Sequence, residues 1–384
     1  RSLFARVAIL LTATHSATAE QVRSTGRLWM SNWVEKLLDI TVIGNDQSMV
    51  KGALANLADR DVKSNPPVGC VIVENDIIIG EGRHEKFGEA HAEVNAFKNA
   101  TENGHNPGNN SEVYVTLEPC GHYGKTPPCA ELISSFKPKA VHIFEKDSHP
   151  ITADKGLELL KHNDIYFEFN EIKGQKSLLD RFYKNNLKKQ PYIILKYAQT
   201  ADQFMASSEG QIQISDQYTS RLSHKWRSLC DGILIGRNTL ETDDPELTNR
   251  HWSGSSPQRF VVGNSFTKPL SSYKMFQGDN PAILITTNKS TFEGIKTVVV
   301  ETIDWNQIWS ILYDQYSIYK LMVEGGSKLL QSVIDAGAWD EARVITSKNN
   351  VENGDISAPI LSAQESYDNL QLINDSVQFF KKVI

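Results

Sequence analysis

One histidine and two cysteines in the first half of the chain are spaced as the ligands of a catalytic metal site. His91 stands at the start of a stretch with helical periodicity, and Cys120 and Cys129 follow a predicted strand. An imidazole and two thiolates suit zinc, and three protein ligands leave a fourth position open for the water molecule that the metal would activate. These residues indicate a single domain that holds a catalytic zinc ion.

Glu93 separates a catalytic zinc site from a structural one. In the deaminase motif this carboxylate carries a proton from the activated water to the departing amine, so it lies beside the metal without binding it. Alone, His91 would be interpreted as a buried core histidine and Glu93 as part of a solvated helix face. Together with the two cysteines they predict a zinc-dependent deaminase. Cys70 and Cys230 lie beside apolar strands and are interpreted as small core residues.

Apolar periodicity divides the chain into two α/β halves, and the charged, proline-bearing stretch at residues 188–191 interrupts the alternation. We predict a zinc deaminase domain over residues 46–188 and a second domain over 189–384, preceded by an extension of uncertain role over 1–45. In the first domain we expect helices at 49–58, 90–100, 130–135, 154–161 and 175–187 and strands at 68–73, 77–79, 112–117, 140–144 and 165–169. In the second we expect a largely parallel sheet covered by helices, with helices at 217–229, 305–315 and 327–336 and strands at 192–198, 231–235, 260–262, 282–286, 297–300, 320–323 and 341–346.

The loop between the two ligand cysteines has eight residues, whereas the common deaminase signature has two. The segments TLEPCGH at residues 116–122 and TPPC at 126–129 resemble the deaminase of riboflavin biosynthesis, and the resemblance extends over residues 46–162. It implies a substrate that is a diaminopyrimidinone carrying a ribosylamino phosphate. Lys125 and His122 of the long loop would then contact that phosphate, with a solvated loop lysine as the alternative interpretation.

A glycine pair in the second half favours an anion site. Glu324-Gly325-Gly326 stands at the end of a predicted strand and precedes a predicted helix, so a phosphate could approach the backbone amides and the helix N-terminus there. A tight turn without a ligand explains the same pair equally well.

Five segments of the second half resemble the reductase of riboflavin biosynthesis, which has a dihydrofolate-reductase-like fold; they lie at residues 196–202, 224–227, 236–239, 243–250 and 324–331. A deaminase followed by a reductase is the order of that family. The resemblance implies that the substrate is contacted by Arg227, Leu247, Arg250 and Glu324. It implies that NADPH is held by Gln199, Thr239, Asp243, Gly326, Ser327, Lys328, Leu329, Leu330 and Gln331. The second half departs from the family pattern in two places: Gln203 replaces a glycine, and Gly263-Asn264 replaces an Asp-containing turn.

These observations predict an α/β chain with a cytidine-deaminase-like, three-layer zinc domain followed by a dihydrofolate-reductase-like α/β domain. The predicted function is the zinc-dependent hydrolytic deamination of 2,5-diamino-6-(5-phosphoribosylamino)pyrimidin-4-one, followed by NADPH reduction of the ribosyl group to ribityl phosphate. One alternative is a deaminase of nucleosides or nucleobases whose second domain has lost reductase activity. Another is an inactive zinc fold that serves as a binding module, which the intact Glu93 disfavours.

Charge and composition disfavour other partners. With 40 Lys+Arg against 46 Asp+Glu, the net charge of -6 offers no basic surface for nucleic acid. No apolar run approaches the ~20 residues needed to span a membrane. Four cysteines in so long a chain cannot form a disulfide framework, which favours the cytoplasm, although residues 1–19 leave an organellar targeting segment as an alternative. We expect a small-molecule substrate, and a homo-oligomer is compatible with the sequence.

Overall fold

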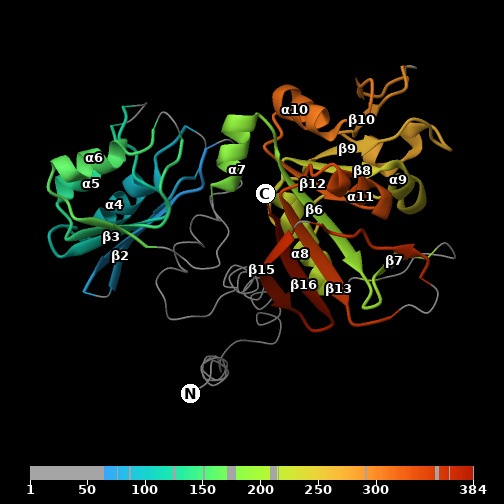
Figure 1. Ribbon diagram of the computed structural model, residues 1–384. Coiled ribbons are helices and arrows are strands. Elements are labelled where there is room, and N and C mark those ends of the chain that lie inside the picture. The colour runs from blue at the N-terminus through green and yellow to red at the C-terminus, as the bar shows by residue number, and fades with distance from the viewer. Residues whose placement is uncertain are drawn as a thin grey trace, which may run out of the picture. The chain divides into compact units, whose positions relative to one another are not determined.

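The computed structural model describes residues 65–383, except 76, 86–87, 124–126, 150–151, 171–178, 208–213, 215, 290–291, 351–353 and 363. The predicted extension over residues 1–45 and the predicted helix at 49–58 lie outside the described residues. Two sheets, of five and nine strands, organise the part of the chain that is described (Figure 1). Among these residues, no helix is both long enough and apolar enough to cross a membrane.

The five-stranded sheet forms the first half, in the order β2-β1-β3-β4-β5. Its strands are β1 Gly69–Glu74, β2 Ile77–Arg83, β3 Ser111–Val115, β4 Ala140–Ile143 and β5 Phe167–Phe169. Strand β1 runs antiparallel to β2 and β3, whereas β3, β4 and β5 are parallel. Side chains from α4 (Ala92–Glu102), α5 (Cys129–Phe136) and α6 (Lys155–His162) complete one core with the sheet. Cys70 is fully buried in that core, as predicted.

Close packing of α4 on β2 fixes where this helix begins. A Cβ atom at Gly82 would lie 2.3 Å from the carbonyl oxygen of Ala92 and 2.3 Å from the amide nitrogen of Ala96. Only glycine allows the strand and the helix backbone to approach so closely. The helix therefore starts directly against the sheet, with His91 as its N-cap residue.

The nine-stranded sheet has the order β11-β10-β9-β8-β12-β6-β13-β16-β15. The seven strands from β11 to β13 in that order are parallel, and β16 and β15 are antiparallel additions at one edge. The bounds are β6 Tyr192–Gln199, β8 Gly232–Gly236, β9 Gln258–Val262, β10 Ile283–Thr286, β11 Thr297–Val299, β12 Lys320–Glu324, β13 Glu341–Ser347, β15 Gln364–Gln371 and β16 Asp375–Lys382. A separate pair joins β7 (Phe204–Ala206) to β14 (Ile356–Ser357).

Helices cover both faces of this sheet, because alternate residues of each strand point to opposite sides. On β6, Ile193 and Leu195 belong to one core with α10 (Trp305–Tyr316) and α11 (Ser327–Asp335). Tyr192 and Ile194 belong to the other core, with α8 (Gln217–Ser228). The remaining elements of this half are α9 Arg237–Asp243 and the short helices η2 Leu270–Ser272 and η3 Lys274–Phe276.

The predicted alternation of helices and strands is confirmed in both halves, and so is the largely parallel sheet predicted for the second half. The sequence did not predict α9 or the C-terminal hairpin β15–β16. Of the predicted helix at 175–187, the structure describes α7 (Asp180–Tyr183) and the π-helix η1 (Lys184–Lys188). Lys184 binds Asp340, and the Asn185 side chain donates to the carbonyl oxygen of Tyr319 at 3.0 Å, so this segment packs on the second sheet. The domain boundary at residue 188 stays a prediction.

Candidate functional site

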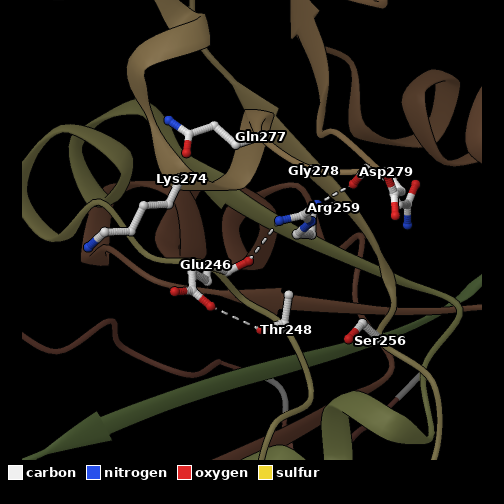
Figure 2. A pocket seen from close by; sticks show the side chains of 9 residues that line it. Glu246, Thr248, Ser256, Arg259, Lys274, Gln277, Gly278 and Asp279 are labelled. Atoms are coloured by element: carbon white, nitrogen blue, oxygen red, sulfur yellow. Dashed lines mark hydrogen bonds between the residues drawn. The ribbon is translucent and has the colours of Figure 1, made fainter.

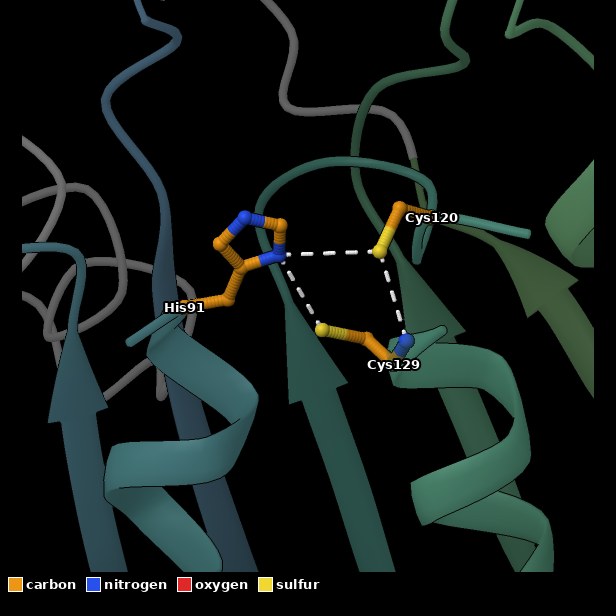
Figure 3. A group of neighbouring side chains, drawn as sticks. All are labelled: His91, Cys120 and Cys129. Atoms are coloured by element: carbon orange, nitrogen blue, oxygen red, sulfur yellow. Dashed lines mark hydrogen bonds between the residues drawn. The ribbon is translucent and has the colours of Figure 1, made fainter. Parts of the chain in front are cut away.

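The three predicted zinc ligands lie together in the first half (Figure 3). His91 caps α4, Cys129 is the first residue of α5, and Cys120 lies in the loop after β3. His91 Nδ1 is 3.3 Å from Cys129 Sγ and 3.5 Å from Cys120 Sγ. The three ligand atoms all lie within 4.8 Å of one another, which fits a single ion bound through Nδ1 and two sulfurs.

The surroundings of Cys120 favour its thiolate form, whereas those of Cys129 favour the thiol. Hydrogen bonds from the Cys129 thiol, the His91 ring and the Cys129 backbone amide lower the pKa of Cys120 to about 4. The hydrogen bond to Cys120 and burial raise the pKa of Cys129. Zinc binds cysteine as the thiolate, so metal binding would release the proton of Cys129.

Glu93 is the second residue of α4 and only 3% exposed. It is not one of the three clustered ligands. Burial, and then the negative charge of Cys120, raise the pKa of its carboxyl group. A carboxyl group next to the metal position, with a pKa above its usual value, is suited to accept and return a proton during the reaction.

The loop between the cysteines is only partly described. His122 and Tyr123 are exposed, and the Tyr123 hydroxyl donates to Glu131 at 2.6 Å. Lys125 lies outside the described residues. The predicted phosphate contacts of this loop stay a prediction.

We expect the purified protein to hold one zinc ion per chain and Cys120→Ser to lose it, because a serine hydroxyl is a poor zinc ligand. Metal analysis of the two proteins by mass spectrometry measures this. Cys230→Ser is the matched control, since Cys230 is also a free thiol but lies buried outside the cluster. Full zinc content in Cys120→Ser would show that the ligand set is wrong.

In the second half, a buried carboxylate lies at the carboxyl end of β12. Glu324 pairs in register with Lys196 on β6, and Lys196 Nζ lies 2.8 Å from Glu324 Oε1. Arg227 of α8 donates two hydrogen bonds of 3.0 Å to the same carboxylate. Burial alone would raise the pKa of Glu324, but Arg227 and Lys196 lower it well below its usual value. Glu324 is therefore a carboxylate held between two cations; Lys196 was not among the predicted site residues.

The loop after α9 carries Arg250, another predicted substrate contact. Its guanidinium pairs with Glu246, but both side chains are more than two-fifths exposed, so the pair is weak and an incoming phosphate could replace the carboxylate. The Arg250 backbone amide binds His224 of α8. Leu247 is only 5% exposed and packs in the α8-side core. Its predicted contact with the substrate stays a prediction.

Two of the predicted cofactor residues, Thr239 and Gly326, meet where α9 and α11 begin. The Gly326 amide donates to Thr239 Oγ1 at 2.9 Å. Gly325 has φ 122°, and a Cβ atom there would lie 2.8 Å from Thr239 Oγ1, so this turn requires glycine. Gln199, at the end of β6, donates to Thr346 Oγ1 at 3.3 Å. The carboxyl ends of parallel strands are the usual place for ligands in such sheets.

The predicted cofactor segment at 326–331 divides into two parts. Gly326, Ser327 and Lys328 form the first turn of α11 and its cap, where backbone amides have no partner within the helix. Leu329 and Leu330 instead lie buried in the core with α10, and Gln331 binds the main chain of residue 360. Asp243, the last residue of α9, is exposed.

The two departures from the family pattern have different local consequences. Gln203 has φ 68°, the left-handed conformation in which glycine is favoured, and its amide donates to the carbonyl oxygen of Thr200 at 2.9 Å. In the other turn, the side-chain oxygen of Asn264 accepts hydrogen bonds of 2.9 Å from Thr286 and from the backbone of Thr287. An aspartate oxygen could accept the same two hydrogen bonds.

A cavity of about 450 Å³ lies at the amino end of β9 (Figure 2). None of the predicted site residues lines it; its walls are Glu246, Thr248, Ser256, Arg259, Lys274, Gln277, Gly278, Asp279 and Asn280. The buried Arg259 side chain joins two walls of the cavity, because it donates to the backbone carbonyls of Glu246 and Asn280. The cavity therefore borders the segment that carries Leu247 and Arg250 and is separate from the carboxyl ends of the strands.

Two protein families match the chain. The family described as "Cytidine and deoxycytidylate deaminase zinc-binding region" matches residues 44–145, and the "RibD C-terminal domain" matches residues 191–378. The riboflavin biosynthesis protein RibD of Bacillus amyloliquefaciens is 31% identical over 331 residues, which are 83% of this chain and 87% of the relative. RibD of Aquifex aeolicus is 31% identical over 320 residues, 80% of this chain and 88% of the relative.

Solved structures give the same result. The diaminohydroxyphosphoribosylaminopyrimidine deaminase/5-amino-6-(5-phosphoribosylamino)uracil reductase of Thermotoga maritima superposes with a TM-score of 0.74 at 27% identity, over 87% of this chain and 97% of that chain. RibD of Acinetobacter baumannii gives a TM-score of 0.67 at 27% identity, over 86% and 96% of the two chains. Both likenesses extend across the two halves of the chain.

Proposed function

The chain belongs to the RibD family of riboflavin biosynthesis proteins, and we propose from this premise that its two halves act in turn on one phosphorylated pyrimidine. It is a bifunctional enzyme with a zinc-dependent deaminase and a reductase. The proposed first step is hydrolytic deamination of 2,5-diamino-6-(5-phosphoribosylamino)pyrimidin-4-one. In the second, NADPH reduces the ribosyl group to ribityl phosphate. The observation that carries the proposal is the cluster of His91, Cys120 and Cys129 beside the buried Glu93.

For deamination, His91, Cys120 and Cys129 would hold zinc and leave one position open for water. The bound metal supplies Lewis acidity that activates this water for attack on the pyrimidine carbon. Glu93 takes the proton released by the water and delivers it to the departing amine, which leaves as ammonia.

For reduction, the cofactor phosphates are proposed to bind the first turn of α11, and the bound cofactor supplies the hydride. Gly326 and Thr239 set the shape of that turn. Arg250 and Arg227 are proposed to hold the substrate phosphate, and Glu324 with Lys196 to face the sugar. The contribution of these side chains is to orient the sugar carbon against the nicotinamide.

Turnover of the diaminopyrimidine phosphate with and without NADPH tests this proposal, with products identified by mass spectrometry. We expect deamination without the cofactor and the ribitylamino product only when NADPH is present. Activity on cytidine, without reduction, would favour a nucleoside or nucleobase deaminase whose second domain has lost reductase activity. Zinc binding without any turnover would favour a binding module. The predicted cytoplasmic location and a homo-oligomeric state stay predictions.

A further inference from the structure

The segment between α9 and β9 carries two of the proposed substrate contacts, Leu247 and Arg250. Leu247 has φ 54°, in the left-handed region that is unfavourable for a residue with a Cβ atom. Such a conformation persists only where the surrounding structure holds it in place, and it is often found at ligand-binding positions. The contacts on either side of Leu247 therefore determine how this segment faces the substrate.

On the amino-terminal side of Leu247, the segment is held by Arg259 of β9, which lines the cavity. The buried guanidinium of Arg259 donates a hydrogen bond of 3.1 Å to the carbonyl oxygen of Glu246 (Figure 2). On the other side, the amide of Asn249 donates to Ser256 Oγ at 2.9 Å. These contacts hold the segment to β9 and to its own loop, but not to the helix that carries Arg227.

His224 provides the link to that helix. Its Nδ1 atom accepts the backbone amide hydrogen of Arg250 at 3.2 Å, and its ring meets the His251 ring edge to face, with centroids 4.7 Å apart. His224 is 4% exposed and lies three residues before Arg227 on α8, so the two share one side of the helix. One imidazole therefore connects the backbone of one arginine with the helix that carries the other.

Burial and nearby positive charges keep the His224 ring neutral, as this hydrogen bond requires, because only an unprotonated Nδ1 can accept. Burial, and then the positive charge of Arg227 on the same helix, lower the pKa of His224 to about 4. His251 and Arg250 in the loop act in the same direction, and Glu324 on β12 opposes them. The ring is an acceptor at neutral pH.

We propose that His224 is a positioning residue for reduction: by accepting the Arg250 amide hydrogen it fixes that arginine relative to Arg227, so that both meet the substrate phosphate. This inference rests on the proposed function, in which the two arginines bind the phosphate. It assigns His224 no contact with the reacting atoms. Its effect should appear as substrate affinity and not as the rate of hydride transfer.

The test compares His224→Gln with His224→Asn in the full chain, supplied with 5-amino-6-(5-phosphoribosylamino)uracil and NADPH. The Asn side-chain oxygen reaches the place of Nδ1, whereas the Gln oxygen reaches the place of Nε2. We expect Gln to raise KM for the phosphorylated substrate about fivefold to tenfold, the effect of losing one such hydrogen bond. We expect Asn to stay within about twofold of the parent KM, and both to keep KM for NADPH and the deaminase rate.

Arg250→Ala separates failure of this inference from failure of the proposed function. If Arg250→Ala leaves KM for the phosphorylated substrate unchanged, the phosphate assignment itself is wrong. If Arg250→Ala raises that KM, two outcomes overturn the inference. In the first, His224→Asn and His224→Gln raise the KM equally. In the second, His224→Gln still raises the KM when it is added to Arg250→Ala. If the Gln protein does not fold, a KM above twofold in the folded Asn variant overturns the inference, and a parent-like KM supports it.

Discussion

Glu93→Gln lowers the rate of deamination by at least ~100-fold while the protein keeps its zinc. Glutamine has nearly the same size as glutamate but cannot carry a proton between the water and the departing amine. Glu93 is buried beside the three ligands and is not one of them, so the substitution leaves the metal site complete. The loss therefore measures proton transfer alone.

Ammonia release and zinc content, measured on the same preparation, test this expectation. Glu102→Gln is the matched control, because it makes the same change at the far end of α4, where Glu102 pairs with Lys98 in solvent. The control should deaminate at the parent rate. Near-normal deamination in Glu93→Gln would end the assignment of Glu93 as the proton carrier, and loss of zinc would show that it also holds the metal.

Gly326→Asp is expected to reduce NADPH-dependent turnover by at least ~100-fold while deamination continues. Gly326 is the N-cap residue of α11, and aspartate is a favoured N-cap, so the variant should fold. Its carboxylate would bind the first helix amides and occupy the place proposed for the cofactor phosphates. Two like charges about 4 Å apart near a protein surface repel by roughly 4 kcal/mol, close to a thousandfold in affinity.

Gly326→Asn is the matched control, since asparagine has the size and capping ability of aspartate without the charge. A Cβ atom at this position lies 3.3 Å from Thr239 Oγ1, so both variants require the same small adjustment. We expect Asn to weaken cofactor affinity less than ~10-fold, as a steric effect alone. Equal affinity for NADPH in the Asp variant and the parent protein would remove this turn from the cofactor site.

The zinc site was the part of the molecule that the sequence predicted best. Histidine and cysteine are rare, and their chemistry as ligands does not depend on knowing the fold. Helical periodicity after His91 and after Cys129 also predicted that both ligands stand at helix starts, as they do in α4 and α5. Glu93 followed from its place two residues after His91, which puts it in the first turn of α4.

The second half could be predicted only in outline, because its important contacts join residues far apart in the sequence. Lys196 stands within an apolar strand, and only the register between β6 and β12 shows that it faces Glu324. His224 looks like any residue of an amphipathic helix until the loop after α9 brings the Arg250 amide to it. The apolar periodicity of a single segment cannot reveal contacts between distant segments.

The predicted cofactor segment at 326–331 shows another limit of prediction from the sequence. Its six residues were carried over as one block, but side chains around a helix point in different directions, so only some of them can face a ligand. Leu329 and Leu330 therefore complete the core, while the amides of the first turn remain for a ligand. Apolar spacing within the helix was a signal that could have made this distinction.

The turn at Gln203 has a consequence for the unfolded chain. A glycine there would adopt φ 68° without strain but would also give the unfolded chain more conformational freedom to lose on folding. Glutamine is strained in the turn by roughly 1 kcal/mol and restricts the unfolded chain by an amount of similar size. The two effects nearly cancel, so this departure from the family pattern leaves the balance between folded and unfolded chain almost unchanged.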